Sequence, residues 1–142
     1  MSPWVADAHM KSGYSDKPLA EKLGVKRGDR VLVRNAPDGY PAALGMTGVV
    51  MAGPRARELD AIIFFAEGAA KLERALPGAI EALKPAGMLW VAWPKKSSGV
   101  ETDLSEDVIR RLALAAGVVD VKVCATSEIW SGLKLVRRVE DR

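Results

Sequence analysis

Residues 60–65 read DAIIFF and residues 88–93 read MLWVAW, and these two stretches decide the fold class. Apolar runs of this length are typical of central strands in a parallel sheet that is covered on both faces. Between them, residues 68–84 carry apolar side chains at helical spacing, namely Leu72, Leu76, Ile80 and Leu83. Pro77 is expected either to kink this helix or to open a second one. A strand, a helix and a strand in this order predict an α/β fold.

The flanking sequence supplies the remaining elements. Four further segments are predicted as strands, at residues 30–34, 48–52, 118–125 and 132–138. Two further helices are predicted, one from Asp16 to Leu23 before Gly24, and one that starts at Ser105 and stops at Gly117. Turns are predicted at residues 26–29, 84–87 and 130–132, and the tail at residues 137–142 is expected to be a solvated run of charges.

These elements predict a reduced Rossmann-like three-layer α/β sandwich with a mostly parallel sheet of about six strands. The C-terminal strand pair is expected to be antiparallel because only a short turn joins its two strands. Residues 1–14 are polar and irregular, which predicts a loosely ordered leader. Residues 15–142 are then expected to form a single domain, as the length of 142 residues favours.

Composition excludes several classes of site. The chain has 21 basic and 18 acidic residues, mixed along the sequence, and this disfavours a dedicated nucleic-acid binder. It has one cysteine and one histidine, which argues against a disulfide framework, a metal centre and a Ser-His-Asp triad. His9 lies in the leader, and Cys124 is predicted to be a buried, inert thiol. Neither a signal peptide nor a membrane span is recognisable, so no membrane partner and a cytoplasmic location are expected.

The candidate ligand site follows from the fold. Ligands of open α/β sheets bind beyond the carboxyl ends of the parallel strands, and right-handed crossovers place those ends at one edge. Three predicted strands end there, followed by residues 35–40, 66–68 and 94–99. The candidate ligand-binding residues are Asn35, Asp38, Tyr40, Glu67, Trp93, Lys95, Lys96, Ser97, Ser98 and Gly99.

Residues 95–99 carry the clearest chemistry. Two ammonium groups and two hydroxyls on a flexible backbone can hold a phosphate or a carboxylate, although the glycine spacing of a nucleotide-triphosphate loop is missing. The alternative is a solvated basic turn in which the serines only close the turn. Asp38 and Glu67 form an acid–base pair if their loops meet, and are otherwise solvated carboxylates. Trp90 is expected in the core, and Trp93 either in the core or against a ligand.

Two resemblances add to this interpretation. The strand opened by Asp60, the segment Leu83–Gly87 and the strand end Trp93-Pro94 resemble the core of class I S-adenosylmethionine-dependent methyltransferases. More closely, the chain is similar to a bacterial family of small proteins known as a domain of unknown function, through Gly13-Tyr14-Ser15, Asn35-Ala36-Pro37, Trp93–Gly99 and Trp130–Lys134. This similarity covers nearly all of the chain after residue 12 and implies no established activity. The methyltransferase resemblance implies the strand order 49–52, 31–35, 61–65, 88–93, 132–138, 118–125.

The chain departs from methyltransferases where they hold their cofactor. Their first strand leads into a glycine-rich turn, whereas residues 35–40 contain one glycine, and Pro37 removes an amide donor. Their second strand usually ends in an acid that binds the ribose, whereas residues 52–55 read AGPR. We therefore expect a non-catalytic methyltransferase-like binding or interaction module with no cofactor, metal or catalytic residue. Its partner is expected to be a small anion or a protein.

Two other functions remain open from the sequence. One is a minimal S-adenosylmethionine-dependent methyltransferase with an atypical pocket, which the missing glycines and ribose acid disfavour. The other is a nucleic-acid accessory protein that uses Lys95, Lys96, Arg55 and Arg57, which the mixed charge disfavours. Arg55 and Arg57 also suggest a 2′-phosphate partner.

Overall fold

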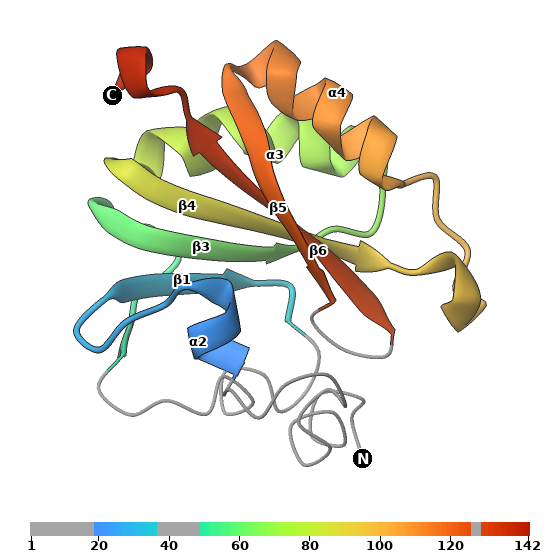
Figure 1. Cartoon of the computed structure of the whole chain (residues 1–142), viewed down its shortest axis with the longest axis horizontal. Coiled ribbons are helices and arrows are strands. Elements are labelled where there is room, and N and C mark those ends of the chain that lie inside the picture. The colour runs from blue at the N-terminus through green and yellow to red at the C-terminus, as the bar shows by residue number, and fades with distance from the viewer. Residues whose placement is uncertain (1–18, 37–48, 126–128) are drawn as a thin grey trace.

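The computed structural model describes residues 19–36, 49–125 and 129–142. Six strands form one sheet: β1 (Arg30–Arg34), β2 (Val50–Met51), β3 (Leu59–Phe65), β4 (Leu83–Pro94), β5 (Val118–Ala125) and β6 (Trp130–Arg137). The helices are α2 (Leu19–Leu23), α3 (Ala69–Ala82) and α4 (Glu106–Ala116), with the short 3₁₀ turns η3 (Lys96–Ser98) and η4 (Val139–Asp141). Figure 1 shows the strands side by side in one twisted layer.

The sheet has the strand order β2-β1-β3-β4-β6-β5. The first four of these strands are parallel, and β6 runs antiparallel to both β4 and β5. This arrangement confirms the predicted α/β class, the mostly parallel sheet and the strand order implied by the resemblance to methyltransferases.

Both faces of the sheet are covered, which explains why residues 88–93 of β4 are all apolar and buried. Leu89, Val91 and Trp93 belong to a core cluster shared with α3 and α4. Met88, Trp90 and Ala92, which point to the other face, belong to a second cluster, shared with α2. Trp90 is fully buried and donates its indole N–H to the carbonyl of Leu23 at the end of α2, over 2.8 Å. The core position predicted for Trp90 is therefore confirmed.

The predicted boundaries of α4 are confirmed by its caps. The Ser105 hydroxyl accepts a hydrogen bond from the backbone N–H of Val108, over 3.2 Å, and Gly117 ends the helix at φ +96°. Such a left-handed residue is readily supplied by glycine, which has no Cβ to clash. α3 continues through Pro77 as one helix, so Pro77 does not open a second one.

Two predicted turns are wrong. Residues 84–87 lie within β4, where Leu59 pairs with Leu83 and Ala61 with Met88, so the intervening residues bulge from the ladder. A Cβ on Gly87 would lie 2.9 Å from the carbonyl oxygen of Leu59, and this close approach accounts for the glycine. Residues 130–132 lie in β6 and pair with residues 92–94 of β4. Gly87 therefore allows close strand packing and does not reverse the chain.

Several expectations fall outside the described residues: the leader at residues 1–14 with His9, and the helix start at Asp16. The end of that helix before Gly24 is confirmed, since Gly24 has φ +81° and Val25 donates its N–H to the carbonyl of Ala20. Within the described ranges, no helix is long and apolar enough to cross a bilayer. Cys124 is half-buried on β5 and packs against the cluster that contains Trp90.

Candidate functional site

The connection from β4 to α4, residues 95–105, is anchored to the loop that follows β3. The Thr102 hydroxyl donates to the carbonyl of Glu67 over 3.1 Å, and the backbone N–H of Ala69 donates to Asp103 Oδ1 over 2.9 Å. The second bond completes the amino end of α3, because its N-cap residue, Gly68, has no side chain to offer. The carboxyl ends of β3 and β4 are thereby held together.

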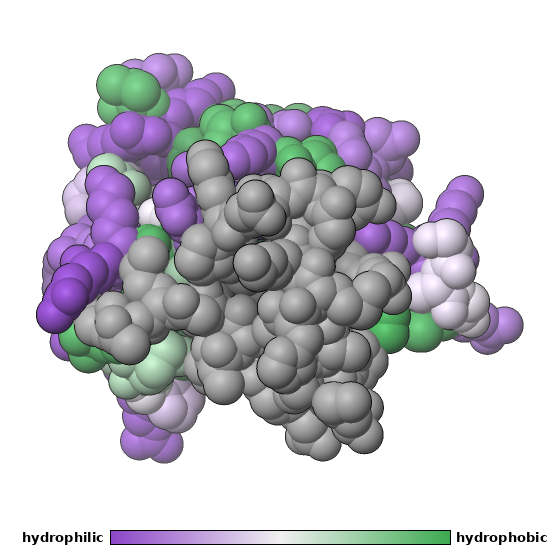
Figure 2. All heavy atoms as spheres, turned by 60° about the horizontal axis from the view of Figure 1, so that its bottom comes forward, coloured by the Kyte–Doolittle hydropathy of each residue, from purple (hydrophilic) through white to green (hydrophobic). Residues whose placement is uncertain are grey.

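An open groove of about 900 Å³ lies at this edge, lined by residues 93–96 and 99–106 and by Ser131 of β6. The apolar part of its lining comes from Trp93 and Leu104, which are only 7% and 6% exposed, and from Val100, which is 51% exposed. The η3 loop stands out from the body at the right of Figure 1, and Figure 2 shows purple and near-white residues on that protrusion, with hydrophobic ones beside its base. The groove can therefore receive a ligand with both apolar and charged parts.

The structure brings together only some of the predicted ligand residues. Four of them line the groove: Trp93, Lys95, Lys96 and Gly99. Trp93 also belongs to the core, so both of its predicted roles are compatible with its position. Asn35, at φ +57°, and Glu67 follow β1 and β3 at the same edge but are not among the groove residues. Asp38 and Tyr40 lie outside the described residues.

Glu67 is an exposed residue whose carboxylate lies 3.8 Å from the Lys71 ammonium on α3. The acid–base pair with Asp38 stays a prediction.

The hydrogen bonds of residues 95–99 close the turn. The Ser98 hydroxyl donates to the carbonyl of Lys95 over 2.6 Å and accepts from the N–H of Val100 over 3.2 Å. The N–H of Lys95 donates to the carbonyl of Ile129, and the N–H groups of Ser98 and Gly99 donate within η3. Most of the loop's amides are therefore engaged, and the ammonium groups are what it offers to a ligand. Among the described residues, neither Lys95 nor Lys96 has an ion-pair partner.

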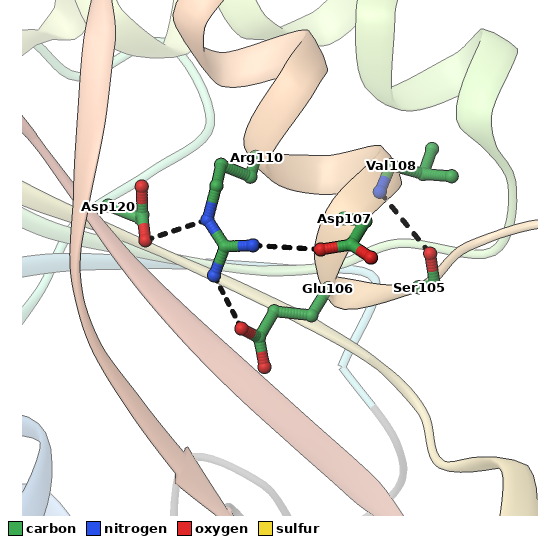
Figure 3. Close-up of polar contacts among 6 residues, drawn as sticks. All are labelled: Ser105, Glu106, Asp107, Val108, Arg110 and Asp120. Carbon is green, nitrogen blue, oxygen red and sulfur yellow. Dashed lines mark hydrogen bonds and ion pairs between the residues drawn. The ribbon is translucent and has the colours of Figure 1, made fainter.

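Most of the acidic side chains beside the groove form ion pairs or hydrogen bonds with other residues of the chain. Arg110 of α4 pairs with Glu106, and its other nitrogens lie 2.9 Å from Asp107 Oδ1 and 2.9 Å from Asp120 Oδ2 (Figure 3). The hydrogen bonds to Glu106 and Asp120 raise the pKa of the Arg110 guanidinium above its ordinary value. Asp103 accepts from Ala69, so of the three carboxylates that line the groove, only that of Glu101 has no such partner in the described chain.

Sequence reasoning missed the partners Thr102, Asp103 and Arg110. The helix start at Ser105 was visible in the sequence, but the contacts of these three side chains reach residues 67, 69 and 120. No local pattern encodes pairings over such separations.

The edge at β1 and β2 differs from a cofactor cradle. β2 pairs only with Arg30 and Val31, so it ends level with the first half of β1. The stretch 52–55 that follows has no acid, and Glu58 precedes β3 at the opposite, amino edge. The described residues therefore place no carboxylate at the carboxyl end of β2, where a ribose would be held.

The four basic residues of the nucleic-acid hypothesis do not share an edge. Arg57 lies just before β3, whereas Lys95 and Lys96 follow β4, and Arg55 lies in the connection from β2 to β3. Because β3 and β4 are parallel, the amino end of one and the carboxyl end of the other lie at opposite edges of the sheet. Arg57 is also paired with Glu81 of α3 over 3.0 Å.

Solved structures with a similar fold include several described as methyltransferases and one described as the [4+2]-cyclase SpnF. A SAM-dependent methyltransferase from Aquifex aeolicus is 16% identical with a TM-score of 0.59, over 82% of this chain and 86% of its own. Magnesium protoporphyrin IX methyltransferase from Synechocystis PCC 6803, with bound SAH, is 13% identical with a TM-score of 0.60, over 92% and 84%. In the Haloferax volcanii complex between the Trm112 methyltransferase activator and a putative methyltransferase, the match is 12% identical with a TM-score of 0.59, over 95% and 94%.

Sequence comparison gives the family. No curated protein matches this chain significantly. The model of the family described as "Protein of unknown function (DUF3052)" matches residues 50–139, which is more than half of the chain and runs from β2 through β6 and the groove. The chain belongs to the DUF3052 family of proteins of unknown function, and it has the methyltransferase fold.

Proposed function

We propose that this protein is a non-catalytic methyltransferase-like binding module that holds an anionic group of its ligand in the groove at the carboxyl end of β4. The observation that carries the proposal is the balance of engaged and available charges there. Asp103 and Glu106 are bound by donors of the chain, whereas Lys95 and Lys96 have no ion-pair partner in the part of the chain described. The available groups of the groove are then two ammonium groups and one carboxylate, that of Glu101. An anion on the ligand complements the available charges.

The size and wall of the groove indicate what carries the anion. A volume of about 900 Å³ is more than a lone phosphate needs, and it lies within the range of roughly 300–1,000 Å³ that small-molecule sites occupy. Trp93 and Leu104 present apolar surface beside the lysines. The fitting ligand is therefore a molecule or peptide segment with an apolar body and an acidic group.

The non-catalytic part of the proposal is supported by the edge at β1 and β2. The short β2 and the acid-free stretch 52–55 leave out the carboxylate that methyltransferases use to hold the ribose of their cofactor. The proposed ligand site lies instead between β4, β6 and α4.

Titration with inorganic phosphate at low salt tests the site. Lys96→Ala is expected to lower phosphate affinity at least about tenfold, or ~1.4 kcal/mol, without changing the urea midpoint. Raising the salt concentration is expected to weaken binding to the parent protein. Lys26→Ala is the matched control, because Lys26 is exposed in the turn before β1, at the opposite edge. Equal affinities in parent and K96A, or no binding by the parent, would contradict the proposal.

A further inference from the structure

We infer that Arg110 is a positioning residue that sets the charge preference of the groove by holding the Glu106 carboxylate away from the lysines. The inference rests on the proposed function, since it concerns the same groove. On this inference, the ion pairs of Arg110 influence which ligands the groove accepts.

The guanidinium of Arg110 is fixed from three sides. Its partners are Glu106 and Asp107 in the first turn of α4 and Asp120 on β5, and Figure 3 shows the three carboxylates arranged around the planar group. Each of the three nitrogens donates to a different carboxylate, so rotation of the side chain would break several bonds at once. Of the three acids, Glu106 alone also lines the groove.

The net charge of the groove depends on this contact. Two ammonium groups, on Lys95 and Lys96, and three carboxylates, on Glu101, Asp103 and Glu106, line the groove. Asp103 is bound at the amino end of α3, where the helix dipole favours a negative charge. Arg110 compensates Glu106. Without Arg110, the Glu106 carboxylate would be available to the lysines and would compete with an anionic ligand.

The local potential is measurable without any ligand. Lys95 and Lys96 can be acetylated by N-hydroxysuccinimide acetate, which is neutral, and by its sulfonated analogue, which is anionic. The ratio of the two rates at each lysine, followed by mass spectrometry on the full chain, reports how strongly the groove attracts an anion. Arg110→Gln is expected to lower the ratio of anionic to neutral rate at least about threefold, because one uncompensated charge acts across a short distance.

Two double variants isolate Glu106. E106Q/R110Q and D107N/R110Q have the same net charge, but only the first removes the carboxylate that lines the groove. We expect E106Q/R110Q to restore the parent ratio and D107N/R110Q to leave it low. Arg111→Gln, at an exposed arginine on the same helix, controls for the loss of one positive charge from α4 and is expected to have a much smaller effect than R110Q.

The outcomes are decisive in both directions. An unchanged ratio in R110Q, or equal restoration by both double variants, would overturn the inference. Should R110Q fail to fold, Arg110→Lys keeps the charge but cannot reach three carboxylates at once, and it is expected to lower the ratio by a smaller factor; no change would again overturn the inference. Phosphate titration of the parent separates the two claims, since a changed ratio without phosphate binding removes the proposed function and leaves the role of Arg110 in place.

Discussion

Asp60 joins three strands at the amino end of the sheet. Its two carboxylate oxygens accept from the backbone N–H of Arg30 on β1, over 2.8 Å, and from the Lys84 ammonium on β4, over 2.9 Å. Burial alone would raise the pKa of Asp60, but the hydrogen bond from Arg30 and the contact with Lys84 outweigh it and hold the pKa below its ordinary value. The carboxylate is therefore a structural clamp at the edge opposite the groove.

Asp60→Asn is expected to destabilise the protein by about 1–2 kcal/mol at pH 7, a figure reduced for the partial exposure of both side chains. Because the pKa is lowered in the folded state, this stabilisation is present above the unfolded pKa of about 4 and is lost as the pH falls through the folded pKa. Urea unfolding at neutral pH and at a series of lower pH values checks this. The difference between the proteins should shrink as the pH falls below the unfolded pKa, while Glu101→Gln, at an exposed residue, should differ little from the parent at any of these pH values.

Among the elements, α3 depends on a side chain that lies far along the sequence. The last turn of α3 contains no basic residue, and Arg137 of β6 donates instead to the carbonyls of Ile80 and Lys84. The Lys84 contact measures 2.9 Å. Such donors satisfy carbonyls that a helix end otherwise leaves open. Arg137 is half-buried, so its predicted place in a solvated tail is wrong, whereas residues 138–142 are exposed as expected.

Arg137→Met is expected to destabilise the protein by about 1–3 kcal/mol, because it removes a half-buried charged donor from the carbonyls of Ile80 and Lys84. Arg138→Met is the matched control, since Arg138 is exposed and its only ion pair among the described residues is with Asp141 in the next turn. Thermal unfolding of both variants checks the difference. Equal melting temperatures would show that Arg137 contributes no more than a solvated arginine.

The strands could be predicted because their signal is local. The apolar run at residues 88–93 reports burial on both faces, and α4 is bounded by Ser105 and Gly117, whose chemistry acts within one turn. The turns predicted at 84–87 and 130–132 were wrong because Gly87 is required by the close approach of β3, and Gly132 lies within a strand, opposite Ala92. Only part of the groove could be predicted. The lysines are adjacent in sequence, and the Glu106–Arg110 pair has the i,i+4 spacing of a helix, whereas Asp103 binds Ala69 and Arg110 also binds Asp120, contacts that no local pattern encodes.

Across the described part of the molecule, the two halves of the methyltransferase fold are built differently. The half from β3 to β6 has long strands and the helices α3 and α4. In the other half, β2 has two residues, and residues 52–58 pass from β2 to β3 without a helix. Ligands of such sheets bind near the carboxyl ends of the strands, and the groove lies on the β4–β6 side of that edge.

The composition of the β1–β2 side predicts weak binding of the methyltransferase cofactor. We expect S-adenosylhomocysteine to bind with a Kd no lower than about 1 mM, which corresponds to ~4 kcal/mol, against ~8 kcal/mol for a micromolar site. The reason is that the sequence offers one glycine in residues 35–40 and no acid in residues 52–55, so the ribose lacks its carboxylate partner. Calorimetric titration of the full chain with S-adenosylhomocysteine, beside phosphate under the same conditions, measures both sites together. A micromolar Kd would contradict the non-catalytic proposal and favour the minimal methyltransferase, and competition between the two ligands would place the cofactor in the groove of Lys95 and Lys96. If the protein has a single ligand site, on the β4–β6 side, S-adenosylhomocysteine must bind weakly while phosphate still binds.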